Sequence, residues 1–321
     1  MLGSCLVELL LGEGVAVTAL VRPGSDLRFL HLLEIPTVQG ELSDQTVIQA
    51  AVANSQLVFH VAAYFNLGST FGVNDEFERY KAANIDLTKA LLSASLEAGV
   101  GRFVYTSSAS VYGPNVTAPV NENAKLNPAT NYGRSKLLAE DCVRAYQARG
   151  LATTIVRPGL IYGPRDRYLL PAFARLRRVP VLPLPDKGCF RVDLVYVRDV
   201  AELMYRASQS EMANGKIYNA ASGSPVALRE LVTHYSAHIG RKTIVVGIST
   251  GVLRRISILA RGYLKLFAPG LEVMLSPTGL AFMSRDMYFD MTRARDDLGF
   301  QSNVEFKHGL ELVAADLTVK A

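Results

Sequence analysis

The chain has 321 residues, a formal net charge of +5, 49% hydrophobic residues and 20% charged residues. This composition is typical of a folded protein with one large domain, and it excludes a disordered chain or a multi-domain array. The basic residues are interleaved with aliphatic ones, so we predict no nucleic-acid partner; a basic surface, or one site for an anionic group such as a phosphate, explains the charge equally well.

The three cysteines are Cys5, Cys142 and Cys189, with no CxxC pair among them. We therefore expect neither a disulfide framework nor a zinc knuckle. We expect the protein to work in a reducing compartment. No basic segment precedes the apolar stretch 6–11, and no uncharged apolar run reaches membrane-spanning length. We predict a cytoplasmic protein.

The first half of the chain alternates helical and strand patterns. The predicted helices are residues 5–12, 44–53, 84–98 and 132–149. The predicted strands are residues 15–21, 38–42, 57–62, 102–106 and 152–157. Such alternation is typical of an α/β fold in which a doubly wound parallel sheet carries helices on both faces.

After Pro158 several prolines interrupt this rhythm. Strands at 192–196 and 217–220, around a helix at 200–208, are expected to return to the sheet. We predict a discontinuous dinucleotide-binding domain and a smaller, mostly C-terminal substrate lobe. The domain comprises residues 1–164 and 189–224, and the lobe comprises residues 165–188 and 225–321.

Tyr132 and Lys136 form a Tyr-x-x-x-Lys element on a predicted helix, where a spacing of four puts both side chains on one face. An ammonium beside a phenol stabilises the phenolate. Tyr132 can then exchange a proton with a substrate alcohol or ketone while hydride moves to or from a nicotinamide. A solvated helix face explains the spacing alone, so the neighbouring motifs decide.

A hydroxyl-rich loop, residues 106–113, follows the predicted strand 102–106. A hydroxyl there can hold a substrate oxygen beside Tyr132, although a turn with capping hydroxyls has the same composition. The loop together with Tyr132 and Lys136 resembles the extended short-chain dehydrogenases/reductases, the family of UDP-galactose epimerase, dihydroflavonol reductase and 3β-hydroxysteroid dehydrogenase. Further matching motifs are His60–Ala63, Asn84, Arg157–Gly159, Tyr162–Pro164, Asp193–Val200 and Tyr218–Asn219.

The resemblance implies a Rossmann-type fold and a role for each matching residue. Ser108 is the catalytic serine, and Asn84 steadies the active-site helix. Lys136 also holds the nicotinamide ribose. Contact with the cofactor is implied for Ala62, Ala63, Pro158 and Gly159. Close packing or a turn is the alternative for the small residues, and a helix cap is the alternative for Asn84.

Cofactor choice is expected at the end of the strand 15–21, where Val21 and Arg22 stand in place of an acid. An arginine there meets the phosphate of NADP, whereas an acid binds the ribose of NAD, so we predict NADP in preference to NAD. A solvated arginine is the alternative. Glu41 and Leu42 occupy the place where relatives carry Asp-Leu beside the adenine.

The opening Met1-Leu2-Gly3 matches only the end of the family's glycine-rich phosphate motif, with Gly3 as the third glycine. The first strand and two glycines are absent, roughly ten to fifteen residues. The loss of that first strand leaves two unpaired strand edges in the interior of the sheet. Our hypothesis is that the working protein is longer, which an intact-mass measurement tests. If the short form is genuine, a non-catalytic, cofactor-binding relative becomes a serious alternative.

The substrate is expected to be a small, hydrophobic or non-nucleotide alcohol or ketone. Nucleotide-sugar enzymes of the family carry an arginine before the aspartate of the late strand, whereas Val192 precedes Asp193 here and Arg191 is one position off. The segment 163–171 is similar to the steroid dehydrogenase and ketone reductase branches. A nucleotide-sugar epimerase or dehydratase with tightly bound NAD is the main alternative.

An amphipathic stretch, residues 252–267, carries arginines and lysine beside an apolar stripe. It predicts either an ordinary lobe helix, a cover for an apolar pocket, or weak contact with a membrane surface.

His234 and His238 lie four apart but lack a third ligand, so no metal site is predicted. A homodimer is left open.

Overall fold

The computed structural model contains a central parallel sheet, as the sequence predicts. The residues that the structure describes are 1–41, 43–66, 76–167, 181–238, 240, 242–259 and 275–319. The sheet order is β10 (Ile217–Ala220), β5 (Thr153–Pro158), β4 (Arg102–Thr106) and β3 (Leu57–His60). All neighbouring pairs are parallel, and β10 joins the sheet after a long excursion.

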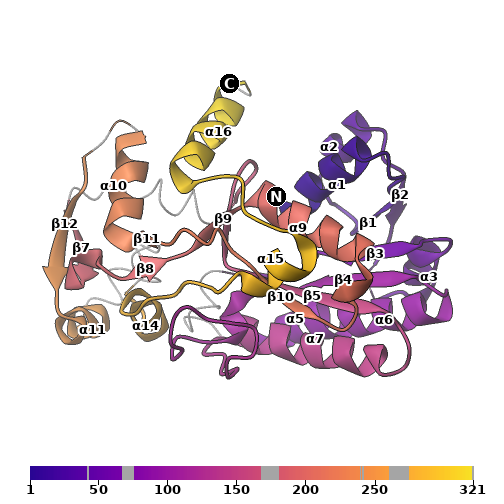
Figure 1. The fold of residues 1–321 in the computed structure, drawn as a ribbon, viewed down its shortest axis with the longest axis horizontal. Helices are drawn as coiled ribbons and strands as arrows, with labels where there is room; N and C mark the ends of the chain where they lie inside the picture. Colours follow the sequence, from indigo (N-terminus) through magenta and orange to yellow (C-terminus); the bar gives the residue numbers. More distant parts are fainter. Residues whose placement is uncertain are drawn as a thin grey trace.

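Helices cover both faces of this sheet (Figure 1). One face carries α1 (Leu2–Gly12) and α9 (Val197–Gln209), and the other carries α3 (Gln45–Val52), α6 (Leu87–Glu97) and α7 (Asn131–Gln147). Side chains of β4 alternate between the two cores: Val104 packs with α1 and α9, whereas Phe103 and Tyr105 pack with α6 and α7. This alternation confirms the doubly wound Rossmann-type fold.

The first two strands form a separate parallel pair, β1 (Ala19–Val21) with β2 (Thr37–Gln39). Among the described residues no ladder joins β1 to β3, which agrees with the expected interior edges. Both strands are shorter than predicted because only three residues of each lie in register with the other. α2 (Arg28–Leu32) lies between them along the chain.

The predicted helix 84–98 is part of a longer, compound helix. It runs through α5 (Phe77–Tyr80), a π-helix η1 (Lys81–Asp86) and then α6. The π-helix has one extra residue per hydrogen-bonded turn, and such turns often occur at functional sites. Asn84 lies within it.

The predicted strand 192–196 does not join the main sheet, which corrects the expectation. It is divided into β8 (Arg191–Val192) and β9 (Leu194–Tyr196), which pair with β11 (Val226–Ala227) and β6 (Leu160–Tyr162). The main sheet already has β10 beside β5, so the backbone of β9 finds its partner in β6 instead.

The remaining elements lie beside the main domain or return to it (Figure 1). One hydrophobic cluster joins β9 to β7 (Val181–Pro185), α10 (Leu228–His238), β12 (Ile244–Ile248) and α16 (Phe306–Val319). A smaller cluster joins α11 (Thr250–Leu259) and α14 (Pro277–Met283), and η3 (Asp186–Gly188) follows β7. η4 (Glu211–Ala213) and α15 (Thr292–Leu298) pack in the cluster of α1 and α9 instead. α15 contacts α9 and β10, so this part of the predicted lobe returns to the main domain. The domain boundaries stay predictions.

No helix within the described ranges combines the length and apolar character needed to cross a membrane.

Candidate active site

The predicted site residues lie where adjacent parallel strands end. Ala62 and Ala63 follow β3, Ser108 follows β4, and Pro158 and Gly159 end and follow β5. Because β3, β4 and β5 are neighbours in one parallel sheet, these positions share its carboxyl edge. Ligands of doubly wound sheets bind at this edge.

The turn of Ser108 packs tightly on the first turn of α7. Ser108 caps the short 3-10 helix η2 (Ala109–Val111), and its Oγ accepts a hydrogen bond from the Ser110 N–H at 3.2 Å. A Cβ added to Gly133 would lie 2.6 Å from the Ser110 carbonyl oxygen. Only glycine permits this approach, which brings the Ser108 turn beside the helix that carries Tyr132.

Tyr132 lies in the first turn of α7. Thr130 caps the helix by accepting a hydrogen bond from the Gly133 N–H at 2.9 Å, which fixes where the helix begins. The half-buried Tyr132 ring meets Phe65 edge-on at 5.0 Å between centroids, and Tyr80 at 6.2 Å. These contacts hold the tyrosine near the chain segment that leaves β3.

Lys136 is buried one turn further along α7, with only 2% of its surface exposed. Its Nζ lies 4.4 Å from the centroid of the Tyr105 ring. Burial disfavours the ammonium and lowers the pKa of Lys136 to about 7, while the negative charge of Glu140 acts in the opposite direction. The amine therefore changes charge near neutral pH.

His60 lies in β3 opposite Tyr105 in the strand register, with 5.5 Å between the ring centroids, and stays neutral. Burial, with a smaller effect of Lys136, lowers the pKa of His60 to about 3. Its Nε2 lies 2.9 Å from the Thr88 hydroxyl. This imidazole adds no positive charge beside Lys136.

Asn84 connects the segment after β3 to α7. Its Oδ1 accepts a hydrogen bond from the Tyr64 N–H at 2.7 Å, and its Nδ2 donates to Ser135 Oγ at 2.9 Å. The Ser135 hydroxyl in turn donates to the Tyr132 carbonyl at 2.8 Å. The buried amide is thus placed to steady the active-site helix, and its position favours that role over a simple helix cap.

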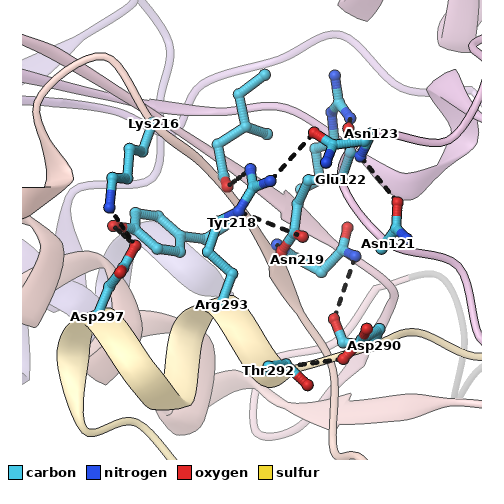
Figure 2. A network of polar contacts seen from close by, with 12 residues as sticks. Asn121, Glu122, Asn123, Lys216, Tyr218, Asn219, Asp290, Thr292, Arg293 and Asp297 are labelled. Carbon is cyan, nitrogen blue, oxygen red and sulfur yellow. Dashed lines mark hydrogen bonds and ion pairs between the residues drawn. The ribbon is translucent and has the colours of Figure 1, made fainter.

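A buried polar network adjoins the site. Its members are residues for which the sequence predicted no role. Arg157 donates to the Tyr112 phenol oxygen at 3.1 Å, and Tyr112 donates to Asn219 Oδ1 at 2.6 Å. Figure 2 shows the far end, where the Asn219 N–H donates to Glu122 at 2.9 Å and Arg293 lies 3.7 Å from the same carboxylate. The network links β5, β10 and α15.

The residues predicted to bind the far end of the cofactor lie on the surface. Arg22 follows β1 and Glu41 follows β2, and both side chains are exposed. Gly3 lies in the first turn of α1, and the described residues place no atom within 4 Å of a Cβ added there. Leu42 lies outside the described residues.

These features fit a nicotinamide cofactor. The small, exposed Ala62 and Ala63 leave the carboxyl edge of β3 accessible to a flat ring or a ribose, and Lys136 provides an amine against the neighbouring strand β4. Arg22 offers a guanidinium for a phosphate. In the part of the chain described, no cluster of three metal-ligating side chains occurs; the His238 side chain lies outside that part.

A cavity of about 570 Å³ lies away from these residues, between the loop 221–225 and the segments 288–292 and 300–302. None of the predicted site residues lines it. The candidate site is therefore taken to be at the strand ends, where the Ser108 turn packs on the helix that carries Tyr132 and Lys136.

Comparisons with known proteins show the family of the chain. The sequence model of the NAD dependent epimerase/dehydratase family matches residues 1–221. The 2-alkyl-3-oxoalkanoate reductase of Stenotrophomonas maltophilia (strain K279a) is 28% identical, over 98% of this chain and 96% of its own length. The 3 beta-hydroxysteroid dehydrogenase/Delta 5→4-isomerase of Mycobacterium tuberculosis (strain CDC 1551 / Oshkosh) is 30% identical, over 93% of this chain and 83% of its own.

Among solved structures, MoeE5 in complex with UDP-glucuronic acid and NAD superposes with a TM-score of 0.75 and 24% sequence identity. The match covers all of this chain and 96% of the other. At this identity the superposition establishes the fold.

Proposed function

Because the chain belongs to the NAD dependent epimerase/dehydratase family and is an NAD(P)-dependent oxidoreductase of the extended short-chain type, we propose that it reduces a hydrophobic ketone with Tyr132 as proton donor. One observation carries the proposal: α7 presents Tyr132 and the buried Lys136 one turn apart, with the Ser108 turn packed against the same helix. A role in binding alone would need no proton donor there.

The chemistry divides between the cofactor and three side chains. A bound reduced nicotinamide supplies the hydride for the carbonyl carbon. Ser108 donates a hydrogen bond to the carbonyl oxygen and orients it toward Tyr132. The Tyr132 hydroxyl gives its proton to that oxygen, which completes the alcohol, and the Lys136 ammonium stabilises the phenolate that is left.

NADP is the proposed cofactor. Arg22 is exposed directly after β1, and we assign its guanidinium to the extra phosphate; Glu41, exposed after β2, is assigned to the adenosine end. The nicotinamide end is assigned to Ala62, Ala63, Lys136, Pro158 and Gly159. Gly3 is assigned to the phosphate end, at the start of α1.

The substrate is proposed to be a ketone that carries alkyl chains, such as a 3-oxoalkanoate, by analogy with the reductase of S. maltophilia. The state of Arg191 supports a non-nucleotide substrate. Its guanidinium makes hydrogen bonds of 2.6 and 3.1 Å to Asp286 and lies 4.5 Å from the Tyr288 ring centroid. Internal partners therefore already bind the arginine nearest to the nucleotide-recognition position of the epimerases.

A cofactor-oxidation assay tests the proposal. NADPH and NADH are titrated first, and then 3-oxo acids, steroid ketones and nucleotide sugars are screened for net oxidation of the cofactor. Tyr132→Phe should lower turnover by about 10²- to 10⁴-fold with cofactor binding retained. Tyr146→Phe, at the far end of the same helix, is the matched control and should remain active. Interconversion of nucleotide sugars without net cofactor change would replace the proposal with an epimerase.

A further inference from the structure

The carboxylate of Glu140 accepts four hydrogen bonds close to the site. It is fully buried and accepts hydrogen bonds from Ser107 Oγ at 2.6 Å and from Arg157 at 2.9 Å and 2.7 Å. Arg144 adds a contact of 3.1 Å from the outer surface of α7. Both carboxylate oxygens are therefore held from more than one direction.

Each buried partner of Glu140 adjoins a residue of the proposed site. Ser107 precedes Ser108 at the end of β4, and Arg157 precedes Pro158 at the end of β5. Glu140 itself lies one helical turn after Lys136 on α7. One carboxylate thus joins the three elements that bear the reacting hydroxyl, the proton-handling pair and the nicotinamide contact.

Stability alone is a weak explanation for this arrangement. Removing a carboxylate and a guanidinium from water is expensive, and a well-packed apolar pair often stabilises a core as well or better. The ion pair offers fixed geometry instead, because a bidentate guanidinium–carboxylate contact defines both distance and orientation. Burial raises the pKa of Glu140, but the hydrogen bonds and charge of Arg157 and the Ser107 bond outweigh it, so the carboxyl stays ionised.

We propose that Glu140 is a positioning residue for the reaction, which holds the Ser107–Ser108 turn and the end of β5 against α7 so that Ser108, Tyr132 and Lys136 keep one arrangement. This inference rests on the proposed reductase function. Glu140 also has a second effect, because its negative charge favours the protonated form of Lys136.

The groups that face Lys136 explain this effect. Tyr105 of β4 lies under the amine, neutral His60 of β3 lies beyond it, and Tyr132 and Glu140 flank it on α7. Of these side chains only Glu140 is negatively charged, and its charge raises the pKa of Lys136 against the effect of burial. Removing that charge should lower the pKa of Lys136 further.

The first experiment compares Ser107→Ala with Arg144→Ala. Each variant removes one hydrogen-bond donor from the same carboxylate, but only Ser107 lies on the reacting turn, and Arg144 is 40% exposed. Ser107→Ala should lower kcat about tenfold or more, since small displacements of reacting groups strongly affect rate. Its dissociation constant for NADPH, measured by calorimetry, should be unchanged. Arg144→Ala should match the wild type in both.

The second experiment titrates Lys136 in Glu140→Gln by NMR of its side chain, assigned with Lys136→Met. The pKa should fall by on the order of one unit relative to the wild type, and the high-pH limb of kcat/KM should move down with it. An unchanged Lys136 titration contradicts the inference. If Glu140→Gln does not fold, the Ser107 and Arg144 pair decides.

The outcomes separate the two proposals. The role of Glu140 is overturned if Ser107→Ala has wild-type turnover, or if Ser107→Ala and Arg144→Ala lose turnover equally. In either case an inactive Tyr132→Phe variant still supports the reductase function. Absence of any ketone reduction by the wild type overturns the function, and the NMR titration still tests the link between Glu140 and Lys136.

Discussion

The separate β1–β2 pair and the four-stranded main sheet differ in how they hold the side chains to which we assign a function. β1 and β2 have three residues each, and Arg22 and Glu41 at their ends are exposed. All five residues of β4 are buried, and Lys136 beside it is 2% exposed. The side chains that we propose for proton transfer thus include a buried amine, whereas cofactor discrimination is assigned to surface side chains. Substitutions in the two parts should therefore differ in the size and kind of their effects.

The largest effect is expected for Lys136→Met. Turnover should fall by at least about 10²-fold, because the phenolate of Tyr132 loses its cation. The fold should gain stability. The folded-state pKa of Lys136 is about 7, below the ordinary lysine value, so burial of the amine destabilises the fold increasingly as pH falls toward 7 and by a constant amount below it.

Thermal unfolding at pH 6 and near pH 10 checks this sign. The variant should exceed the wild type by on the order of a few kcal/mol at pH 6, and the gain should shrink toward pH 10. A gain that grows with pH would contradict the assigned ionisation of Lys136.

Two helical glycines sharpen the comparison of the two parts. Gly133→Ala brings a Cβ to within 2.6 Å of the Ser110 carbonyl, so it should destabilise the protein by about 1–3 kcal/mol and reduce turnover. Gly3→Ala meets no described atom within 4 Å and should stabilise α1 by about 0.5–1 kcal/mol. Denaturant unfolding of both variants measures the difference. Equal changes in the free energy of unfolding for the two variants would contradict the close packing of the Ser108 turn on α7.

A smaller and more specific effect is expected for Arg22→Ala. Loss of a charge-assisted contact to the additional phosphate should weaken NADPH binding about tenfold and leave NADH binding unchanged. Calorimetric titration with both cofactors provides the measurement. Arg254→Ala removes the same charge from the exposed surface of α11 and serves as the control. Equal weakening of NADPH and NADH would remove the assignment of Arg22 to the phosphate.

The smallest effect concerns weak membrane contact, one of the three alternatives for the stretch 252–267. Val252, Ile256 and Leu259 of α11 are 44%, 41% and 87% exposed, and two arginines lie between them; residues 260–267 are outside the described part of the chain. Val252→Ser combined with Ile256→Ser should reduce co-sedimentation with vesicles containing phosphatidylserine, without changing turnover in solution. Absence of vesicle binding by the wild type contradicts the proposal.

The sequence predicted several strands well because they follow from local pattern: strands 102–106 and 217–220 were predicted at their observed bounds. Tyr132 and Lys136 lie on one helix, as their spacing predicts. Ser108 was selected among several hydroxyls by the resemblance to the family, and the roles of these three residues stay predictions. Long-range partners were harder to predict. Asn84 was expected near α7, but its bond to Ser135 depends on the π-helix, which no spacing rule revealed.

Glu140 was missed, although a signal exists. It falls on the same helical stripe as Lys136 and the buried Val143, so a second charged residue was predictable on an inward face. Its partner Arg157 belongs to a matching motif, but nothing local in the sequence pairs a residue of β5 with one of α7. Such pairings arise from topology, since parallel strand ends meet only after the sheet forms.

The π-helix before α6 has a consequence for how this helix can change. Thr88 adds a hydrogen bond to the wide turn, because its hydroxyl donates to the Asn84 carbonyl at 2.7 Å. One extra residue is thus stored inside the helix without breaking it. Deleting Ala82 would restore ordinary winding and leave the upstream turn, including Tyr80, in phase with α6, because a wide π-turn takes up one more residue than an α-turn. The effect of such a deletion would therefore fall on the wide turn itself and on the position of Asn84, whose amide joins the chain after β3 to α7.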